Sequence, residues 1–254
     1  MNKKLLSIIL LVTVLLGAIT GCAKEKNVAN VNDITIGTLK TLQTIQPFFY
    51  EQFSDENEKL DIKIFKNSDE MKTELISGKL DFAILPIETV VIAASEGEDI
   101  KIISNINQET INIDDEISLS KNLKDNILEY SSNKKNSSNN KRLNLKAVMV
   151  TTNDEIDENP EKVREIVDKN KKSVKYIMEN KDEWINKAEE LGIEGKNIEK
   201  EVENINLYYD ITEENVEYIK KIAEIMKDFG MIEKVPNIKN MFDLTFLESS
   251  KLKR

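Results

Sequence analysis

The stretch SDEMKTELISGKLDFAILPIETVVIAA, residues 68–94, decides the fold of the chain around it. Its pattern predicts a helix that stops near Gly78, then a short buried strand, and then a second helix. The strand is predicted because Leu80 and residues 82–85 form an apolar run that is too short for a helix and is bounded by breakers. Pro86 is expected to end the strand. In open α/β sheets, ligands bind where the carboxyl end of a strand leads onto a helix N-terminus.

Strands and helices alternate on either side of this stretch. Alternating or continuous apolar patterns predict strands at residues 34–39, 60–65, 101–106 and 145–151. Apolar positions at helical spacing predict a helix starting near Gln46 and three long helices starting near Pro160, passing through Trp184 and starting after Thr212. The order of elements predicts the fold class α/β, with a mostly parallel sheet flanked by helices.

Composition excludes several classes of function. The chain has 254 residues and a formal net charge of −10, from 36 basic and 46 acidic residues, which argues against a nucleic-acid partner. It has no His, so neither a His-based catalytic site nor a His-based metal site is possible. Its single Cys rules out an intramolecular disulfide. We therefore expect no catalytic residues, no metal site and no cofactor.

The first 21 residues have the pattern of a lipoprotein signal peptide. Lys3 and Lys4 precede a continuous apolar run, residues 5–16, which is short for a membrane span. The run leads to Ile19-Thr20-Gly21-Cys22, which looks like a bacterial lipobox, so Cys22 is predicted to carry acyl chains such as palmitate. The alternative is a chance Cys after an ordinary signal peptide. Residues 22–33 are polar and are predicted to be the lipidated N-terminus and tether.

The centre of the chain, residues 106–144, is polar and weakly periodic. Ser120 can cap a short helix there, whereas Ser131–Lys141 contains only Ser, Asn and Lys. This composition cannot bury much apolar surface and favours a solvated loop. The alternative is contact with an anionic polymer or lipid through the basic residues Lys134, Lys135, Lys141 and Arg142.

Several motifs together resemble one family. A helix ending in Ser77-Gly78, a turn with Lys79, a strand with Asp81 and Ala83, and then Pro86 are typical of the substrate-binding lipoproteins of ABC importers. The resemblance is to the nitrate, sulfonate and thiamine-precursor branch, which has the type II periplasmic-binding-protein fold. ITIGTLK, residues 34–40, and the segment 148–180 extend it over most of the chain.

The resemblance implies a ligand site in the first lobe. Position by position, it assigns ligand contacts to two loops, made of Thr38, Lys40 and Thr41, and of Pro86, Glu88 and Thr89. Free N–H groups at helix starts and threonine hydroxyls suit a small polar ligand. The alternative is that the hydroxyls only cap helices. Tyr208 and Tyr209 are candidates for a stacking wall, although a place in the core or at the rim fits them better.

The resemblance also implies partners and a location. A binding protein of this family delivers a small-molecule ligand to an ABC permease and its ATPase, and is held on the extracytoplasmic face of the bacterial cell membrane by its lipid anchor. We expect a monomer. Residues 34–105 and 145–254 would form the α/β lobe, and residues 106–144 a reduced second lobe, because a lobe of ordinary size needs roughly a hundred residues.

Two other functions remain open at this point. The first is a single-lobe surface lipoprotein that acts through a protein partner, without small-molecule transport. The second is an enzyme, because some menaquinone-pathway enzymes share this fold. The absence of His, the expected lipidation of Cys22 and the lack of an acid–base constellation all weigh against an enzyme.

Overall fold

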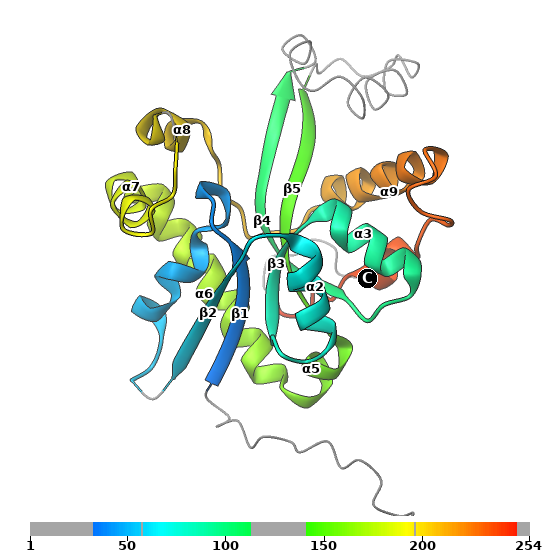
Figure 1. Ribbon diagram of the computed structural model, residues 1–254, viewed down its shortest axis with the longest axis horizontal. Helices are drawn as coiled ribbons and strands as arrows, with labels where there is room; N and C mark the ends of the chain where they lie inside the picture. The colour runs from blue at the N-terminus through cyan, green and yellow to red at the C-terminus, as the bar shows by residue number, and fades with distance from the viewer. Residues whose placement is uncertain (1–32, 57, 113–140, 196, 248–254) are drawn as a thin grey trace, which may run out of the picture. The chain divides into compact units, whose positions relative to one another are not determined.

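Five strands form one mixed sheet in the order β2-β1-β3-β5-β4 (Figure 1). The computed structural model describes residues 33–56, 58–112, 141–195 and 197–247. The chain divides into two units, Met1–Asp33 and Ile34–Arg254, and apart from Asp33 the described residues belong to the second. The predicted signal peptide, Cys22 and the helix predicted after Ser120 lie outside the described residues. Within the described ranges, none of the helices is both long and apolar enough to cross a bilayer.

The strands run in two directions. β1 (Asp33–Leu39) pairs in parallel with β3 (Phe82–Pro86), in line with the sequence prediction. β5 (Lys141–Thr151) is antiparallel to β3 and to β4 (Lys101–Asn112), so the sheet is mixed. β2 (Lys59–Phe65) closes the other edge.

Helices cover both faces of the sheet. The helical elements are η1 (Leu42–Thr44), η2 (Gln46–Phe53), α2 (Ser68–Ile76), α3 (Ile87–Glu96), α5 (Asn153–Glu158), α6 (Pro160–Glu179), α7 (Lys181–Glu190), α8 (Ile198–Asn204), α9 (Glu213–Asp228) and η4 (Ile238–Met241). α6 packs on η2 and β4, whereas α9 packs on β5 and α3. The result is an α/β lobe, as the sequence predicts.

Local chemistry explains the ends of the helices. The side chain of Asn67 accepts a hydrogen bond of 2.8 Å from the backbone N–H of Glu70, which caps α2. Gly97 ends α3 with φ at 84°, a left-handed conformation that favours glycine. Thr212 and Asn215 form a capping box at the start of α9. The capping box confirms the predicted start of this helix after Thr212.

Two expected details are different in the structure. Leu42–Phe53 forms two 3₁₀ segments instead of one α-helix, with Pro47 in the first turn of the second segment. Asn159 directly precedes Pro160, where a side-chain cap is expected, but it makes no cap hydrogen bond to α6; its Nδ2 donates to Oε2 of Glu155 in the preceding α5 at 2.9 Å. A separate short helix, α5, also lies between β5 and α6.

Asp81 ties the start of β3 to two other elements. One carboxylate oxygen accepts the backbone N–H of Thr35 at 2.6 Å, and the other is 3.1 Å from Nζ of Lys162 on α6. The same ammonium group lies 3.0 Å from Oε1 of Glu155. Burial raises the pKa of the Glu155 carboxyl, and the hydrogen bond from Lys162 opposes that rise. The Asp of the recognised motif therefore holds β1, β3 and α6 together.

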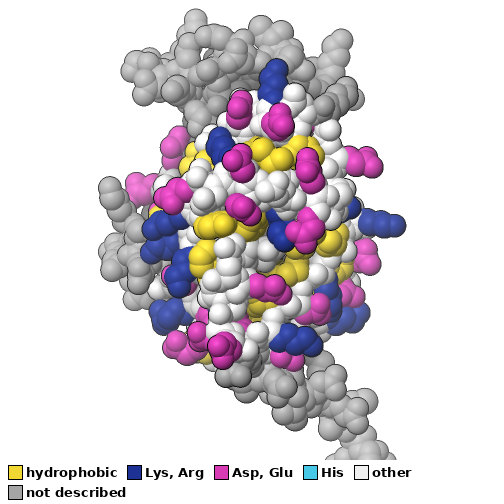
Figure 2. All heavy atoms as spheres, turned by 90° about the vertical axis from the view of Figure 1, so that its left-hand side faces the viewer, with side chains coloured by type: hydrophobic (Ala, Val, Ile, Leu, Met, Phe, Trp, Pro, Cys, Tyr) yellow, Lys and Arg dark blue, Asp and Glu magenta, His cyan; other side chains and the backbone are white. Residues whose placement is uncertain are grey.

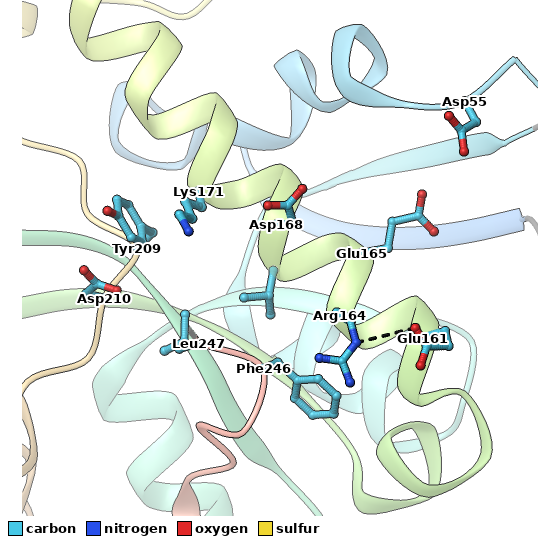
Figure 3. A pocket seen from close by; sticks show the side chains of 11 residues that line it. Asp55, Glu161, Arg164, Glu165, Asp168, Lys171, Tyr209, Asp210, Phe246 and Leu247 are labelled. Carbon is cyan, nitrogen blue, oxygen red and sulfur yellow. Dashed lines mark ion pairs between the residues drawn. The ribbon is translucent and has the colours of Figure 1, made fainter. Parts of the chain in front are cut away.

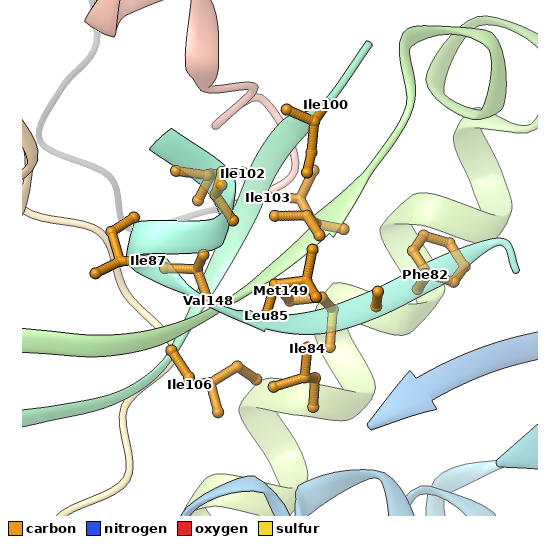
Figure 4. Close-up of a cluster of buried hydrophobic side chains, with 14 of the residues drawn as sticks. Phe82, Ile84, Leu85, Ile87, Ile100, Ile102, Ile103, Ile106, Val148 and Met149 are labelled. Atoms are coloured by element: carbon orange, nitrogen blue, oxygen red, sulfur yellow. The ribbon is translucent and has the colours of Figure 1, made fainter. Parts of the chain in front are cut away.

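The sheet and its helices enclose one large apolar core (Figure 4). Phe82, Ile84 and Leu85 of β3 are fully buried, as expected for a strand covered on both faces. A second cluster forms around Trp184 of α7, which is also fully buried, and includes Leu42 and Ile45 from the chain that follows β1. Trp184 is therefore a packing residue of this second cluster.

Candidate functional site

The carboxyl edge of the sheet brings the two predicted ligand loops to one side of the lobe. β1 and β3 are parallel neighbours, with Ile36 beside Phe82 and Gly37 beside Ala83, so both strands end at the same edge. β1 leads into the turn before η1, and β3 leads directly into α3. The residues assigned from the sequence therefore lie at one edge of the sheet, which is where open α/β sheets bind ligands.

Two of the predicted hydroxyls are engaged inside the lobe. Thr38 is fully buried, and its hydroxyl donates to the carbonyl oxygen of Thr44 at 3.0 Å. Thr89 is 8% exposed, and its hydroxyl donates to Oγ of Ser68 at 3.0 Å. These bonds stabilise the turn after β1 and the contact between α3 and α2. In this structure, both hydroxyls support the loops.

The other four predicted residues reach solvent. Lys40 is exposed, and its ammonium group lies close to Gly192, just beyond the end of α7. A Cβ atom built on Gly192 would be 3.4 Å from Nζ of Lys40. Thr41 is half-buried and shares a hydrogen bond of 2.9 Å with the hydroxyl of Thr44. Pro86 and Glu88 are half-buried at the start of α3. One cation and one carboxylate are thus the charges that these loops offer to a ligand.

The first turn of α3 contains a carboxylate of the chain itself. Pro86 occupies the N-cap position and makes no side-chain cap hydrogen bond, while Glu88 lies in the first turn. A carboxylate at this position is stabilised by the partial positive charge of the helix N-terminus. An anionic ligand at the same place would meet Glu88 as a like charge.

The paired strands β4 and β5 continue past the ends of β1 and β3. β3 ends where Pro86 faces Ala147, whereas β4 and β5 remain paired from Asn107–Ala147 out to Asn112–Lys141. We call this extension the ribbon, residues 108–112 and 141–146. Figure 1 shows it projecting beyond the sheet. The ladder has three irregularities between Ile102 and Gln108, so the ribbon leaves the sheet through bulged strand.

Helix α9 holds both strands of the ribbon at its base. Asn215 donates from Nδ2 to Oε1 of Gln108 on β4 at 2.7 Å. One turn further along α9, the hydroxyl of Tyr218 donates to Oδ1 of Asn144 on β5 at 2.7 Å. Gln108 also accepts from Nδ2 of Asn105 at 2.8 Å. These polar contacts fix the direction in which the ribbon leaves the lobe.

Removing one of these contacts should loosen the ribbon. We expect Tyr218→Phe to lower the free energy of unfolding by about 0.5–1.5 kcal/mol and to speed amide exchange at residues 144–146. Asn144→Ala should have a similar effect, and the double variant should cost no more than the larger single effect, because both remove the same bond. Chemical denaturation with hydrogen exchange measures this, and fully additive losses would contradict the contact.

A pocket lies at the same edge, between the turn after β1, the ribbon and α8. Its volume is about 550 Å³. It is lined by Gln43, Glu109, Asn197, Lys200, Glu201, Asn204 and Ile205. Glu109 also pairs with Lys146 across the ribbon at 3.3 Å. None of the six predicted ligand residues lines this pocket. Sequence reasoning missed it because α8 returns to this edge through tertiary packing alone.

A second hollow, of about 430 Å³, lies on the outer face of α6 (Figure 3). Arg164 stacks over the ring of Phe246 at 5.5 Å and pairs with Glu161 at 3.5 Å, at one end of the hollow. Tyr209 and Lys171 lie toward the other end (Figure 3). None of the six predicted residues lines this hollow either. Among the described residues, no group of three or more Asp, Glu, Cys or His side chains is placed to hold a metal ion.

Comparison with solved structures identifies the fold. It resembles the ligand-binding component of an ABC-type import system from Staphylococcus aureus with zinc bound, at a TM-score of 0.64 and 12% identity, over 86% of this chain and 98% of that one. It also resembles the alkanesulfonate-binding protein SsuA from Xanthomonas axonopodis pv. citri bound to MOPS, at 0.62 and 8% identity, over 84% and 98%.

A third neighbour bears on the fold alone. The Candida albicans CA3427 gene product, described as having the generic periplasmic binding protein fold, aligns at a TM-score of 0.59 and 11% identity over 83% of this chain and 96% of that one. No family model matches the sequence, and no curated protein matches it. The chain thus has a periplasmic-binding-protein-like α/β fold.

Proposed function

We propose that this protein is an extracytoplasmic solute-binding component of an ABC importer that holds a small polar ligand at the carboxyl edge of its sheet. The main support is that the two ligand loops lie at the same edge of the sheet, at the ends of β1 and β3. The fold also resembles that of binding proteins of import systems. The ligand would contact Lys40, Thr41, Pro86 and Glu88, which reach solvent there. Thr38 and Thr89 would position these loops through their internal hydrogen bonds. The proposed partners are a permease and an ATPase, and the role is not enzymatic.

The charge at the start of α3 indicates the class of ligand. Because Glu88 occupies the first turn of α3, an oxyanion is disfavoured there, and a neutral or cationic solute is favoured. This would separate the chain from its alkanesulfonate-binding neighbour, despite the shared fold.

Calorimetric titration tests this preference. We expect thiamine, a cation, and 4-aminopyrimidine, which is neutral, to bind more tightly than methanesulfonate or nitrate. Glu88→Gln should weaken thiamine binding by about tenfold or less, because one partly solvated charge contact is lost. Glu96→Gln, at the exposed far end of the same helix, is the matched control. Tight methanesulfonate binding by the wild type would contradict the preference while leaving the location of the site open.

The second lobe is proposed to be reduced. Residues 34–105 and 145–254 would form the α/β lobe, and residues 106–144, which include the described strand ends of the ribbon, would take the place of a full second lobe. A ligand would then be contacted from one side, whereas useful affinity for a small ligand requires most of its surface to be buried. Binding by the isolated chain should therefore be weak, with a Kd of about 1 mM or more.

Membrane attachment is proposed to occur through Cys22. The segment before it has the pattern of a lipoprotein signal peptide, and several acyl chains would make a stable anchor. We expect wild-type protein in the membrane fraction of a bacterial host with a blocked N-terminus, and Cys22→Ala to be released or to accumulate as the precursor. Mass spectrometry of the fractions decides this, and unmodified wild-type protein in the soluble fraction would argue against the anchor.

One observation favours the alternative, a single-lobe surface lipoprotein that acts through a protein partner. The hydroxyls of Thr38 and Thr89 are engaged inside the lobe, and none of the six predicted residues lines either pocket. If no solute binds, the exposed part of this edge would serve a protein partner. Neighbouring genes for a permease and an ATPase would favour the importer role, and their absence the alternative.

A further inference from the structure

The strand β2 forms an open edge of the sheet. It is the outermost strand in the order β2-β1-β3-β5-β4, and its only neighbour in the described part of the sheet is β1. None of its seven residues is fully buried, in contrast to the four buried residues of β3. Ile64 is 47% exposed, which is unusual for a large apolar side chain in this lobe. An unpaired strand edge is a template for pairing with another chain.

The sequence of β2, KLDIKIF, is complementary to itself when two copies run antiparallel. We propose that β2 pairs with β2 of a second copy of this chain, with Ile62 facing Ile62 across a two-fold axis. In that register Asp61 faces Lys63, and Lys63 faces Asp61, on one side of the new ribbon. On the other side Leu60 faces Ile64, so the exposed isoleucine gains an apolar partner.

The charges select this register over its neighbours. A shift by two residues in one direction places Asp61 opposite Asp61, and a shift in the other direction places Lys63 opposite Lys63. Like charges directly opposite each other are destabilising, whereas opposite charges stabilise the pair. The register centred on Ile62 also pairs all seven residues and sets Lys59 against Phe65, whose ring can pack on the lysine stem.

A second copy fits this edge better than an unrelated strand. Lysines on an edge strand ordinarily prevent pairing, but Asp61 between Lys59 and Lys63 makes the edge compatible with its own copy. Figure 2 shows the face that lies on the left in Figure 1, and Lys, Arg, Asp and Glu side chains are interspersed over it. The resulting contact is isologous and closes as a dimer, in place of the expected monomer.

Charge-swap variants test the contact in solution. Sedimentation velocity of the chain bearing Cys22→Ser should show a concentration-dependent dimer at or below about 100 µM. Asp61→Lys and Lys63→Asp should each raise the dimer Kd by about tenfold or more, because each turns two attractive pairs into repulsive ones. The double variant exchanges the charges and should restore the dimer. A monomeric wild type, or single variants that dimerise as the wild type does, would overturn the proposal.

A disulfide test reports the register itself. In the same Cys22→Ser background, Ile62→Cys should form an intermolecular disulfide on mild oxidation, because the two cysteines would face each other across the axis. Ile64→Cys is the matched control and should not, since each introduced thiol would face Leu60 of the other copy. Equal crosslinking of both variants, or crosslinking of Ile64→Cys alone, would reject the register. Circular dichroism confirms that each variant is folded.

Discussion

Lys169→Met should lower the free energy of unfolding by about 3–5 kcal/mol, the range for breaking a buried ion pair on one side only. Lys169 lies on α6 and is 2% exposed, although it carries a charge. Its Nζ is 2.7 Å from Oε2 of Glu58 and 2.5 Å from Oε1 of Glu165. The side chain of Glu58 is only 6% exposed, so removal of the cation leaves a carboxylate with little access to water. Urea denaturation at neutral pH measures the loss.

The control variant also removes the buried charge of Glu58. Glu58→Gln combined with Lys169→Met should recover most of the loss, because no uncompensated ion remains buried. Glu165→Gln alone should cost less, since the side chain of Glu165 is 41% exposed. Equal losses for Lys169→Met and Glu165→Gln would contradict the assignment of Glu58 as the buried partner of the ion pair.

The pH dependence of Lys169→Met follows from Glu58. Burial raises the pKa of the Glu58 carboxyl above its ordinary value of 4.5, and Lys169 opposes that rise. Without Lys169, the folded chain holds the proton on Glu58 to a higher pH than the unfolded chain does. A group with a raised folded pKa contributes stability at low pH and loses it as the pH rises through that pKa. The deficit of the variant should therefore shrink as the pH falls from about 7 toward 5. A deficit that is constant with pH would argue against a charged Glu58.

Trp184→Ala should lower the free energy of unfolding by about 3–5 kcal/mol, as expected for a large aromatic side chain removed from a core. Trp184 is fully buried in the second apolar cluster, with Leu42, Ile45 and Val202. Val202 comes from α8, whereas Leu42 and Ile45 come from the chain after β1. The cavity would therefore also loosen the turn that carries Lys40 and Thr41.

Trp184→Phe separates the effect of lost side-chain volume from the effect of a lost hydrogen bond. Nε1 of Trp184 has no hydrogen-bond partner among the described residues, so phenylalanine loses volume and no hydrogen bond. We expect it to cost less than half of the loss for Trp184→Ala, and amide exchange at residues 40–46 to quicken in the alanine variant alone. Guanidinium denaturation with hydrogen exchange measures both, and a loss below about 1 kcal/mol for Trp184→Ala would contradict a close-packed cluster.

Most elements were predictable because they depend on local chemistry. Asn67, Gly97 and Thr212 mark helix ends through caps and a left-handed turn, which act over a few residues. The direction of β5 and the length of the ribbon were not predictable from the pattern. Both depend on pairing between β4 and β5, whose residues lie far apart in the sequence. The 3₁₀ segments after β1 also escaped prediction, because apolar spacing alone does not separate a 3₁₀ segment from an α-helix.

The location of the candidate site was predictable, but the use of each side chain was not. Parallel pairing of β1 with β3 places the two loops at one edge, and the motif around Asp81 and Pro86 indicates that arrangement. The hydrogen bond of Thr38 to Thr44 and that of Thr89 to Ser68 depend on how the turns fold back. The pocket beside Gln43 depends on the position of α8, for which the sequence has no strong local signal.

The central claim is that the carboxyl edge of the sheet contacts a small polar solute from one side. Amide NMR spectra of the chain titrated with thiamine test this claim most directly. We predict progressive, fast-exchange shifts at residues 38–44 and 87–89, half-saturated at about 1 mM or above. Methanesulfonate at the same concentrations should shift these amides less, because of Glu88. Shifts confined to the hollow on α6, or no shifts at the two loops at saturating thiamine, would contradict the claim.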